Sequence, residues 1–170
     1  RHFQEREVTA GRSRQTALNL MVDRYSDPDP SILMADRGYE SFNAFAHIIR
    51  KNMKFVIRMK DIDSNGILSS YDLPDDESDT RIKTTLTRRH TKETVGNPDI
   101  YTILQPSTDF DFPDEKCRYY DISSRIVRIR LENGSYICIA TNLPEEEFSL
   151  KDIKKLYKMR WSEETSFREL

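Results

Sequence analysis

The sequence predicts an α/β fold, and three observations lead to that prediction. A strand–helix–strand order runs through residues 32–57. Residues 61–142 are divided by turn clusters and contain runs rich in Thr, Tyr and Ile, which is typical of a mostly β segment. Residues 149–170 carry apolar and aromatic side chains at helical spacing. We therefore expect an α/β core from residues 1–60 and 146–170, with residues 61–145 as a β-rich insertion before the last helix.

The first part of the chain alternates predicted helices and strands. Residues 12–25 group their apolar side chains at roughly helical spacing, and the Pro-containing run 27–30 ends that helix. The apolar run 32–35 is closed by turn residues, as in a buried strand, and residues 40–52 return to helical spacing. Residues 55–57 form a second apolar strand. A strand, a helix and a second strand predict a right-handed parallel crossover.

Turn and capping residues predict the elements near the C-terminus. Residues 125–131 alternate imperfectly, and residues 135–141 are a second strand candidate. Asn133-Gly134 between them is a strong hairpin signal. Ser149, with Asp152 three residues later, resembles a weak capping box and predicts the start of the final helix.

Composition excludes several protein classes. The 170 residues fit one domain, or one domain with a large insertion. No stretch approaches the roughly 20 apolar residues that span a bilayer, and 5 Gly and 7 Pro are too few for a collagenous chain. The formal net charge of −2 gives no global basic footprint, so composition alone does not suggest nucleic acid.

The cysteines and histidines do not predict a metal centre or a nucleophilic site. Cys117 and Cys138 form no CxxC pair, so we expect two small buried hydrophobic residues rather than a zinc site. No Ser/His/Asp arrangement, Gly-rich phosphate loop or HExxH motif is present. Three histidines lie in unrelated sequence contexts, where we expect structural or solvated roles: His2, His47 and His90.

Asp36 is the first candidate site residue. It lies at the carboxyl end of a predicted buried strand, where open α/β sheets bind ligands. A carboxylate oxygen there is a suitable ligand for Mg²⁺. The alternative, which the spacing alone favours, is that Asp36 is the N-cap of a helix over residues 38–52.

The final helix carries a second group of candidates. At about 100° per residue, Tyr157, Arg160 and Glu164 share one stripe of the helix. A carboxylate beside Tyr, Arg and Trp on a core-facing stripe is unusual, because buried carboxylates need a partner or a metal. The alternative is an Arg160–Glu164 ion pair on a partly exposed face.

Basic residues supply a third group. The stretch 81–92, which includes Arg88 and Arg89, is the densest basic run and would suit phosphate contacts. A solvated basic strand or loop is the alternative. Three arginines of the predicted hairpin could also face a polyanion: Arg125, Arg128 and Arg130.

Two of these segments resemble a known family. Residues 34–40 (MADRGYE) resemble the Asp-Arg-Gly-Tyr segment of bacterial insertion-sequence transposases of the DDE type. Residues 156–170, with Tyr157, Arg160 and Glu164, resemble their Y-(2)-R-(3)-E-(6)-K signature. The segment 141–144 (TNLP) is also similar to that group. The resemblance spans essentially the whole chain.

The resemblance implies a ribonuclease-H-like core with a β-rich insertion. It implies that Asp36 and Glu164 are the second and third catalytic carboxylates and metal ligands, and that two Mg²⁺ (or Mn²⁺) ions support phosphoryl transfer in the intact protein. Five residues are expected to bind DNA: Tyr157, Arg160, Trp161, Arg88 and Arg89.

The sequence also departs from the family pattern. We find no candidate for the first catalytic Asp, whose strand would precede residues 12–25, and the signature Lys would fall just beyond Leu170. Position 163 is Glu, where relatives usually carry an apolar residue. Because the chain starts at Arg1 and ends within a predicted helix, we expect a fragment that lacks the N-terminal core strands. A natural terminus with a frayed helix is the alternative.

We accordingly expect part of a transposase that cleaves insertion-sequence ends and transfers the strand, with the isolated chain inactive and a poor binder of divalent cations. The implied partners are transposon-end and target DNA and a second copy of the protein, without a membrane, in the bacterial cytoplasm near the nucleoid. Two alternatives stay open. One is a metal-dependent nuclease of the same fold, and the other is a non-catalytic DNA-binding or assembly remnant.

Overall fold

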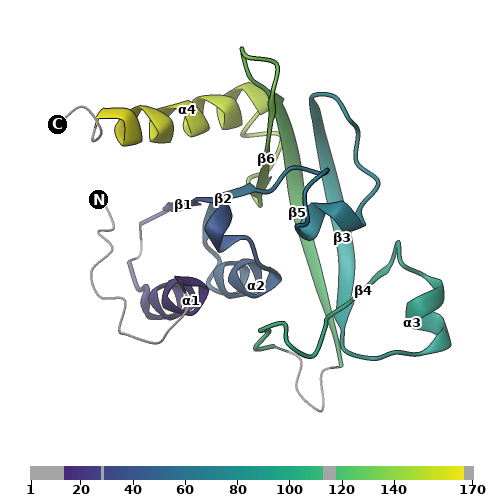
Figure 1. Ribbon diagram of the computed structural model, residues 1–170. Coiled ribbons are helices and arrows are strands. Elements are labelled where there is room, and N and C mark those ends of the chain that lie inside the picture. The colour runs from purple at the N-terminus through teal and green to yellow at the C-terminus, as the bar shows by residue number, and fades with distance from the viewer. Residues whose placement is uncertain (1–13, 28, 113–117, 167–170) are drawn as a thin grey trace.

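The computed structural model describes the backbone of residues 14–27, 29–112 and 118–166, and the side chains of these residues as far as Arg160. The described part is a mixed α/β structure with one six-stranded sheet in the order β1-β2-β6-β5-β3-β4 (Figure 1). The strands are β1 (Ile32–Ala35), β2 (Lys54–Met59), β3 (Ser78–Thr87), β4 (Tyr101–Ile103), β5 (Tyr119–Arg130) and β6 (Tyr136–Thr141). The α/β class predicted from the sequence is therefore confirmed.

Helices lie on both faces of this sheet. The α-helices are α1 (Arg14–Arg24), α2 (Phe42–Arg50), α3 (Lys92–Gly96) and α4 (Leu150–Ser166), and short 3₁₀ turns span Arg37–Tyr39 and Ile67–Ser70. In Figure 1, α1 and α2 lie together below the sheet, whereas α4 lies above it. Successive strand residues point to opposite faces, so Ile57 packs towards α1 and α2 while Val56 packs towards α4.

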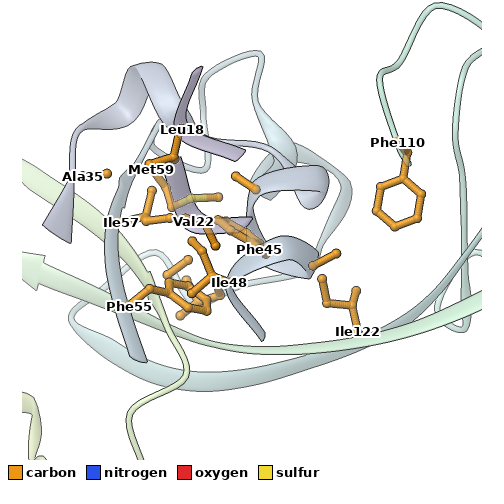
Figure 2. Packing of buried hydrophobic residues seen from close by; sticks show 14 of the residues in the cluster. Leu18, Val22, Ala35, Phe45, Ile48, Phe55, Ile57, Met59, Phe110 and Ile122 are labelled. Atoms are coloured by element: carbon orange, nitrogen blue, oxygen red, sulfur yellow. The ribbon is translucent and has the colours of Figure 1, made fainter. Parts of the chain in front are cut away.

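The larger core lies between the sheet and the α1–α2 pair. Phe45 of α2 stacks on Phe55 of β2, with ring centroids 5.2 Å apart. Figure 2 shows these side chains converging from α1, α2, β1 and β2, with Ile122 of β5 alongside. The smaller core lies under α4, where Ile153 is completely buried against the other face of the sheet.

The parallel strand–helix–strand unit is confirmed. β1 and β2 pair in parallel, with Ala35 opposite Ile57, and α2 connects them. Ser41 is the N-cap of α2, because its hydroxyl accepts a hydrogen bond from the Ala44 N–H at 3.1 Å. The predicted helix over 40–52 therefore begins two residues later, after the 3₁₀ turn.

The predicted hairpin is also confirmed. β5 and β6 pair antiparallel, with Arg130 opposite Tyr136. Gly134 adopts φ +81°, and its N–H donates to the Leu131 carbonyl at 2.9 Å. Only glycine takes this left-handed conformation without a steric penalty, which explains why Asn133-Gly134 marks the turn.

The strands of residues 61–145 continue the sheet of the first segment. β6 pairs antiparallel with β2, placing Ala140 opposite Ile57. The side chain of Asn142 extends this junction, since it accepts from the Phe55 N–H at 2.9 Å and donates to the Met53 carbonyl at 2.8 Å. The division of the chain at residues 60 and 145 stays a prediction.

Two arginines of β5 do not face a polyanion, and that expectation was wrong. Arg125 is 2% exposed, donates to both Asp79 carboxylate oxygens and also to the Phe148 carbonyl. Arg128 is 4% exposed and donates to both oxygens of Asp61. These buried cations are paired within the protein because an unpaired buried charge is costly. Arg130 is exposed.

Candidate active site

Asp36 lies immediately after β1, at the edge of the described sheet. Its side-chain Oδ1 accepts a hydrogen bond from the Arg37 N–H at 2.8 Å and so caps the 3₁₀ turn Arg37–Tyr39. Because Ser41 caps α2, Asp36 is not the cap of that helix. The Asp36 side chain is 47% exposed. A carboxylate that caps a single turn and stays half exposed can still accept a ligand.

Arg58 of β2 is the nearest cation to Asp36 among the ion pairs of the described residues. Its Nη1 lies 3.9 Å from Asp36 Oδ1. The parallel pairing of Ala35 with Ile57 brings the next residue of each strand to the same end of the sheet. Arg58 was not among the residues predicted from the sequence. The available signal was its place directly after the apolar run 55–57, at the carboxyl end of the neighbouring strand.

Arg58 also connects this strand end to α4. Its guanidinium carbon lies 5.9 Å from the centroid of the Tyr157 ring, near the outer limit of a cation–π contact. Tyr157 itself packs against the core cluster under α4. The segments around Asp36 and Tyr157, far apart in the sequence, therefore meet through one arginine side chain.

The start of α4 is held as the sequence predicted. The Ser149 N–H donates to Asp152 Oδ2 at 3.0 Å, and the Asp152 N–H donates to the Ser149 hydroxyl at 3.4 Å. Hydrogen bonds from the Ser149 side chain and backbone lower the pKa of Asp152. This reciprocal pair sets the first turn, from which Ile153 and Leu156 project into the core.

Glu164 and Trp161 lie in α4, which continues to Ser166, but their side chains lie outside the described residues. Helical geometry places Glu164 on the stripe of Tyr157, two turns and about 10 Å further along the axis. Arg160, one turn after Tyr157, is half-buried. In the part of the chain whose side chains are described, no three His, Cys, Asp or Glu residues gather into a metal site. A joint metal site of Asp36 and Glu164 stays a prediction.

Arg88 and Arg89 lie at the far end of the sheet. They follow β3, which the strand order places four strands from β1. At about 4.8 Å per strand, this is a separation of roughly 20 Å across the sheet alone. Arg88 donates to the carbonyls of Gln105 and Thr108 at 2.8 and 2.7 Å, so it braces the loop after β4. The structure does not bring either arginine together with Asp36.

His47 has structural contacts. Its side chain is 9% exposed and lies 2.8 Å from Asp23 on one ring nitrogen and 2.8 Å from Asp111 on the other. Carboxylates only accept, so a ring nitrogen that carries a hydrogen donates in each such bond. The hydrogen bond from His47, with a second from Asn43, lowers the pKa of Asp111. His90 is exposed, and His2 lies outside the described residues.

Cys138 is a buried thiol, as expected. It is 1% exposed and donates to Asp61 Oδ1 at 3.2 Å. Burial, together with the hydrogen bond to Asp61, raises the pKa of Cys138 to about 12. The thiol therefore stays protonated at neutral pH and is not poised as a nucleophile. Cys117 lies outside the described residues.

Comparison with protein families agrees with the resemblance carried by the two segments. Residues 4–170 match the family model described as transposase DDE domain. No curated protein matches the chain significantly. Over the residues that the structure describes, no helix has the length and apolar character needed to cross a membrane.

Proposed function

The chain belongs to the transposase DDE domain family, and from this premise we propose that it supplies part of the active site that cleaves insertion-sequence ends and joins them to target DNA. Membership of the family implies a nucleotidyl-transfer enzyme that acts on DNA with divalent metal. In the proposal, Asp36 and Glu164 are two of its catalytic carboxylates. The segment 61–145 is the β-rich insertion into a ribonuclease-H-like core.

The accessible carboxylate of Asp36 is compatible with a hard divalent cation. Asp36 and Glu164 would hold Mg²⁺ or Mn²⁺, and the chemistry supplied by two bound ions is activation of the attacking water or 3′-hydroxyl and stabilisation of the leaving oxygen. Two carboxylates alone make a poor site for two ions. The isolated chain should therefore bind divalent cations weakly and cleave no DNA.

The observation that carries the proposal is the position of Arg58 between Asp36 and Tyr157. It supports a site in which residues at the end of β1 and in the C-terminal half of α4 act on one substrate. A guanidinium within a few ångströms of a catalytic carboxylate is well suited to bind the phosphate that the water or 3′-hydroxyl attacks.

The remaining DNA contacts follow from this placement. Tyr157, Arg160 and Trp161 would bind the DNA end near its terminal phosphate. Arg88 and Arg89, at the far end of the sheet, would contact the backbone of the duplex away from the cleavage point. Assembly as a homodimer on paired ends would place two such sites together.

The test uses the full-length protein that carries this chain, with donor DNA ending in its insertion-sequence terminus. Asp36→Asn should lower Mg²⁺-dependent cleavage at least about 1000-fold, because the metal loses a ligand. Arg58→Gln should lower it about 10-fold through weaker phosphate binding. Asp99→Asn, an exposed carboxylate after α3, is the matched control and should cleave at the parent rate.

The products distinguish the remaining functions. Joined donor and target DNA supports strand transfer. Cleaved but unjoined DNA identifies a nuclease with the same carboxylates instead. DNA binding without cleavage in the full-length protein would indicate a non-catalytic assembly module. Cleavage by the isolated chain that disappears in Asp36→Asn would contradict the expected inactivity of this part.

A further inference from the structure

The Asp36 turn has little backbone support of its own. β1 pairs only with β2 among the described strands, so the turn projects from an edge of the described sheet. Within the turn, the Tyr39 N–H donates to the Asp36 carbonyl at 2.9 Å and the Glu40 N–H donates to the Arg37 carbonyl at 3.4 Å. The hydrogen-bond geometry of a 3₁₀ turn is poorer than that of an α-helix. Tyr39 packs the turn against the larger core, and a further contact joins it to the segment after β2.

Glu40, four residues after Asp36, makes that contact. Its Oε2 accepts from the Lys60 N–H at 2.7 Å, and its Oε1 accepts from the Ile67 N–H at 2.6 Å. Both are short hydrogen bonds to a charged acceptor, which are stronger than neutral ones. Each oxygen of Glu40 accepts from a backbone amide, so the carboxylate ties its turn to the segment that follows β2.

The loop facing Glu40 is shaped to receive it. A Cβ atom at Gly66 would lie 2.6 Å from Glu40 Oε1 and 2.9 Å from the Lys60 Cβ, so no side chain fits at this position. Lys60 also donates from Nζ to the Asn65 carbonyl at 3.0 Å, which folds the loop back on itself. The close approach of Glu40 therefore depends on glycine for space rather than for an unusual φ angle.

These contacts connect the two chain segments that form the proposed site. Lys60 lies two residues after Arg58 on the same chain segment, and Arg58 lies 3.9 Å from Asp36. Glu40 thus ties the turn that carries Asp36 to the strand end that carries Arg58.

We propose that Glu40 is a positioning residue for Asp36, acting through its two hydrogen bonds to the Lys60 and Ile67 amides. The proposal rests on the proposed function, since it assigns to Glu40 an effect on catalysis by Asp36. Displacements of about 1 Å at a reacting group cost up to about 100-fold in rate. Glu40 should therefore control the rate of the chemical step rather than DNA affinity.

Two variants of the full-length protein test this from opposite sides. Glu40→Gln keeps the size of the side chain but turns an amide N–H₂ towards one backbone donor. Gly66→Ala leaves Glu40 unchanged and forces it away from Ile67. Matched controls are Glu147→Gln, an exposed glutamate before α4, and Gly96→Ala, where an added Cβ has no neighbour within 4 Å.

Three quantities are measured for each variant. These are the single-turnover cleavage rate at saturating DNA and Mg²⁺, the dissociation constant for end DNA, and hydrogen exchange at the Lys60 and Ile67 amides. We expect both variants to cleave about 10- to 100-fold more slowly, with faster exchange at those amides, DNA affinity within about twofold and an unchanged folded fraction. The controls should match the parent protein.

Two outcomes overturn the proposal while leaving the function intact. One is parent-like cleavage in both variants although the amides exchange faster. The other is a loss of activity that equals the loss of folded protein, since Glu40 would then be structural only. Asp36→Asn, run alongside, separates the two proposals. If parent and Asp36→Asn are equally inactive, the proposed function fails and the positioning role fails with it.

Discussion

The Asp36 turn and the His47 cluster place carboxylates beside nitrogen-bearing side chains at different distances. At His47, the carboxylates of Asp23 and Asp111 each lie 2.8 Å from a ring nitrogen of a nearly buried imidazole. At Asp36, the nearest cation is 3.9 Å away. All three carboxylates are about half exposed, so the contrast lies in their hydrogen bonds. The imidazole holds Asp23 and Asp111, whereas Asp36 accepts from a backbone amide of its own turn and can still accept an external ligand.

This difference separates a stabilising cluster from a site. The His47 cluster joins α1, α2 and the segment after β4, three parts of the chain that are not adjacent in sequence. Phe112 packs edge-on against the imidazole, and Arg50 lies over the same Phe112 ring. Asp36, in contrast, contributes one short hydrogen bond to its own turn. Substitution of His47 should therefore lower stability, whereas substitution of Asp36 should lower activity.

The largest expected effect on stability comes from the His47 cluster. His47→Ala should lower the free energy of unfolding by about 3 kcal/mol, because it removes a buried imidazole, its packing against Phe112 and its hydrogen bonds to Asp23 and Asp111. Asp36→Asn should change it by less than about 1 kcal/mol. Urea denaturation of the 170-residue chain measures both. An equal or larger loss for Asp36→Asn would assign Asp36 a structural role and remove the contrast.

The next effect is the dependence of stability on acid. The pKa of Asp111 is lowered in the folded protein, so Asp111 contributes stability that is present above its unfolded pKa of about 3.9 and is lost as pH falls through the folded value. Asp111→Asn should cost about 1 kcal/mol at neutral pH and reduce the further loss below about pH 4.

The contribution of Asp111 is measured by the unfolding free energies of the parent chain and of Asp111→Asn between pH 6 and pH 3. Asp109→Asn, an exposed neighbour, serves as the control and should keep the parent's acid dependence. If the unfolding free energies of the parent chain and of Asp111→Asn fall in parallel with pH, Asp111 does not contribute to the acid-dependent loss of stability.

The smallest effects distinguish two adjacent arginines. Arg88→Ala should lower the unfolding free energy by about 0.5 kcal/mol, because Arg88 donates to two loop carbonyls at an exposed position. Arg89→Ala should leave stability unchanged and reduce the salt dependence of DNA binding by about one unit of slope. Unchanged slopes for both variants in the full-length protein would exclude this end of the sheet from the DNA path.

Much of the local structure could be predicted from the sequence. The strand Ile32–Ala35 has the predicted bounds, and α1 lies within the predicted 12–25. The Ser149–Asp152 cap and the Gly134 turn are present, because capping and left-handed conformations depend on a few neighbouring residues. The choice of Ser41 over Asp36 as the cap of α2 could not be made, since both spacings are compatible with a helix start.

Side-chain pairing over long separations in the chain could not be predicted. The sequence around Arg125 and Arg128 is that of a basic hairpin. In the structure both arginines form ion pairs with aspartates 46 and 67 residues away, Asp79 and Asp61. The contact of Arg58 with Asp36 and Tyr157 depends equally on strand register and on the path of α4. Neither the period of apolar residues nor the charge count contains this information.

The sequence by itself therefore determined the α/β class, the parallel crossover, the hairpin and the family, because these depend on periodicity, turn chemistry and short motifs. Tertiary structure decided which polar side chains have partners within the protein. It buried His47, Arg125 and Arg128 with partners from other segments, and it left Asp36 half exposed beside Arg58. The physical reason is that a charge becomes structural or available according to its neighbours in space, which the packing of the sheet and helices sets.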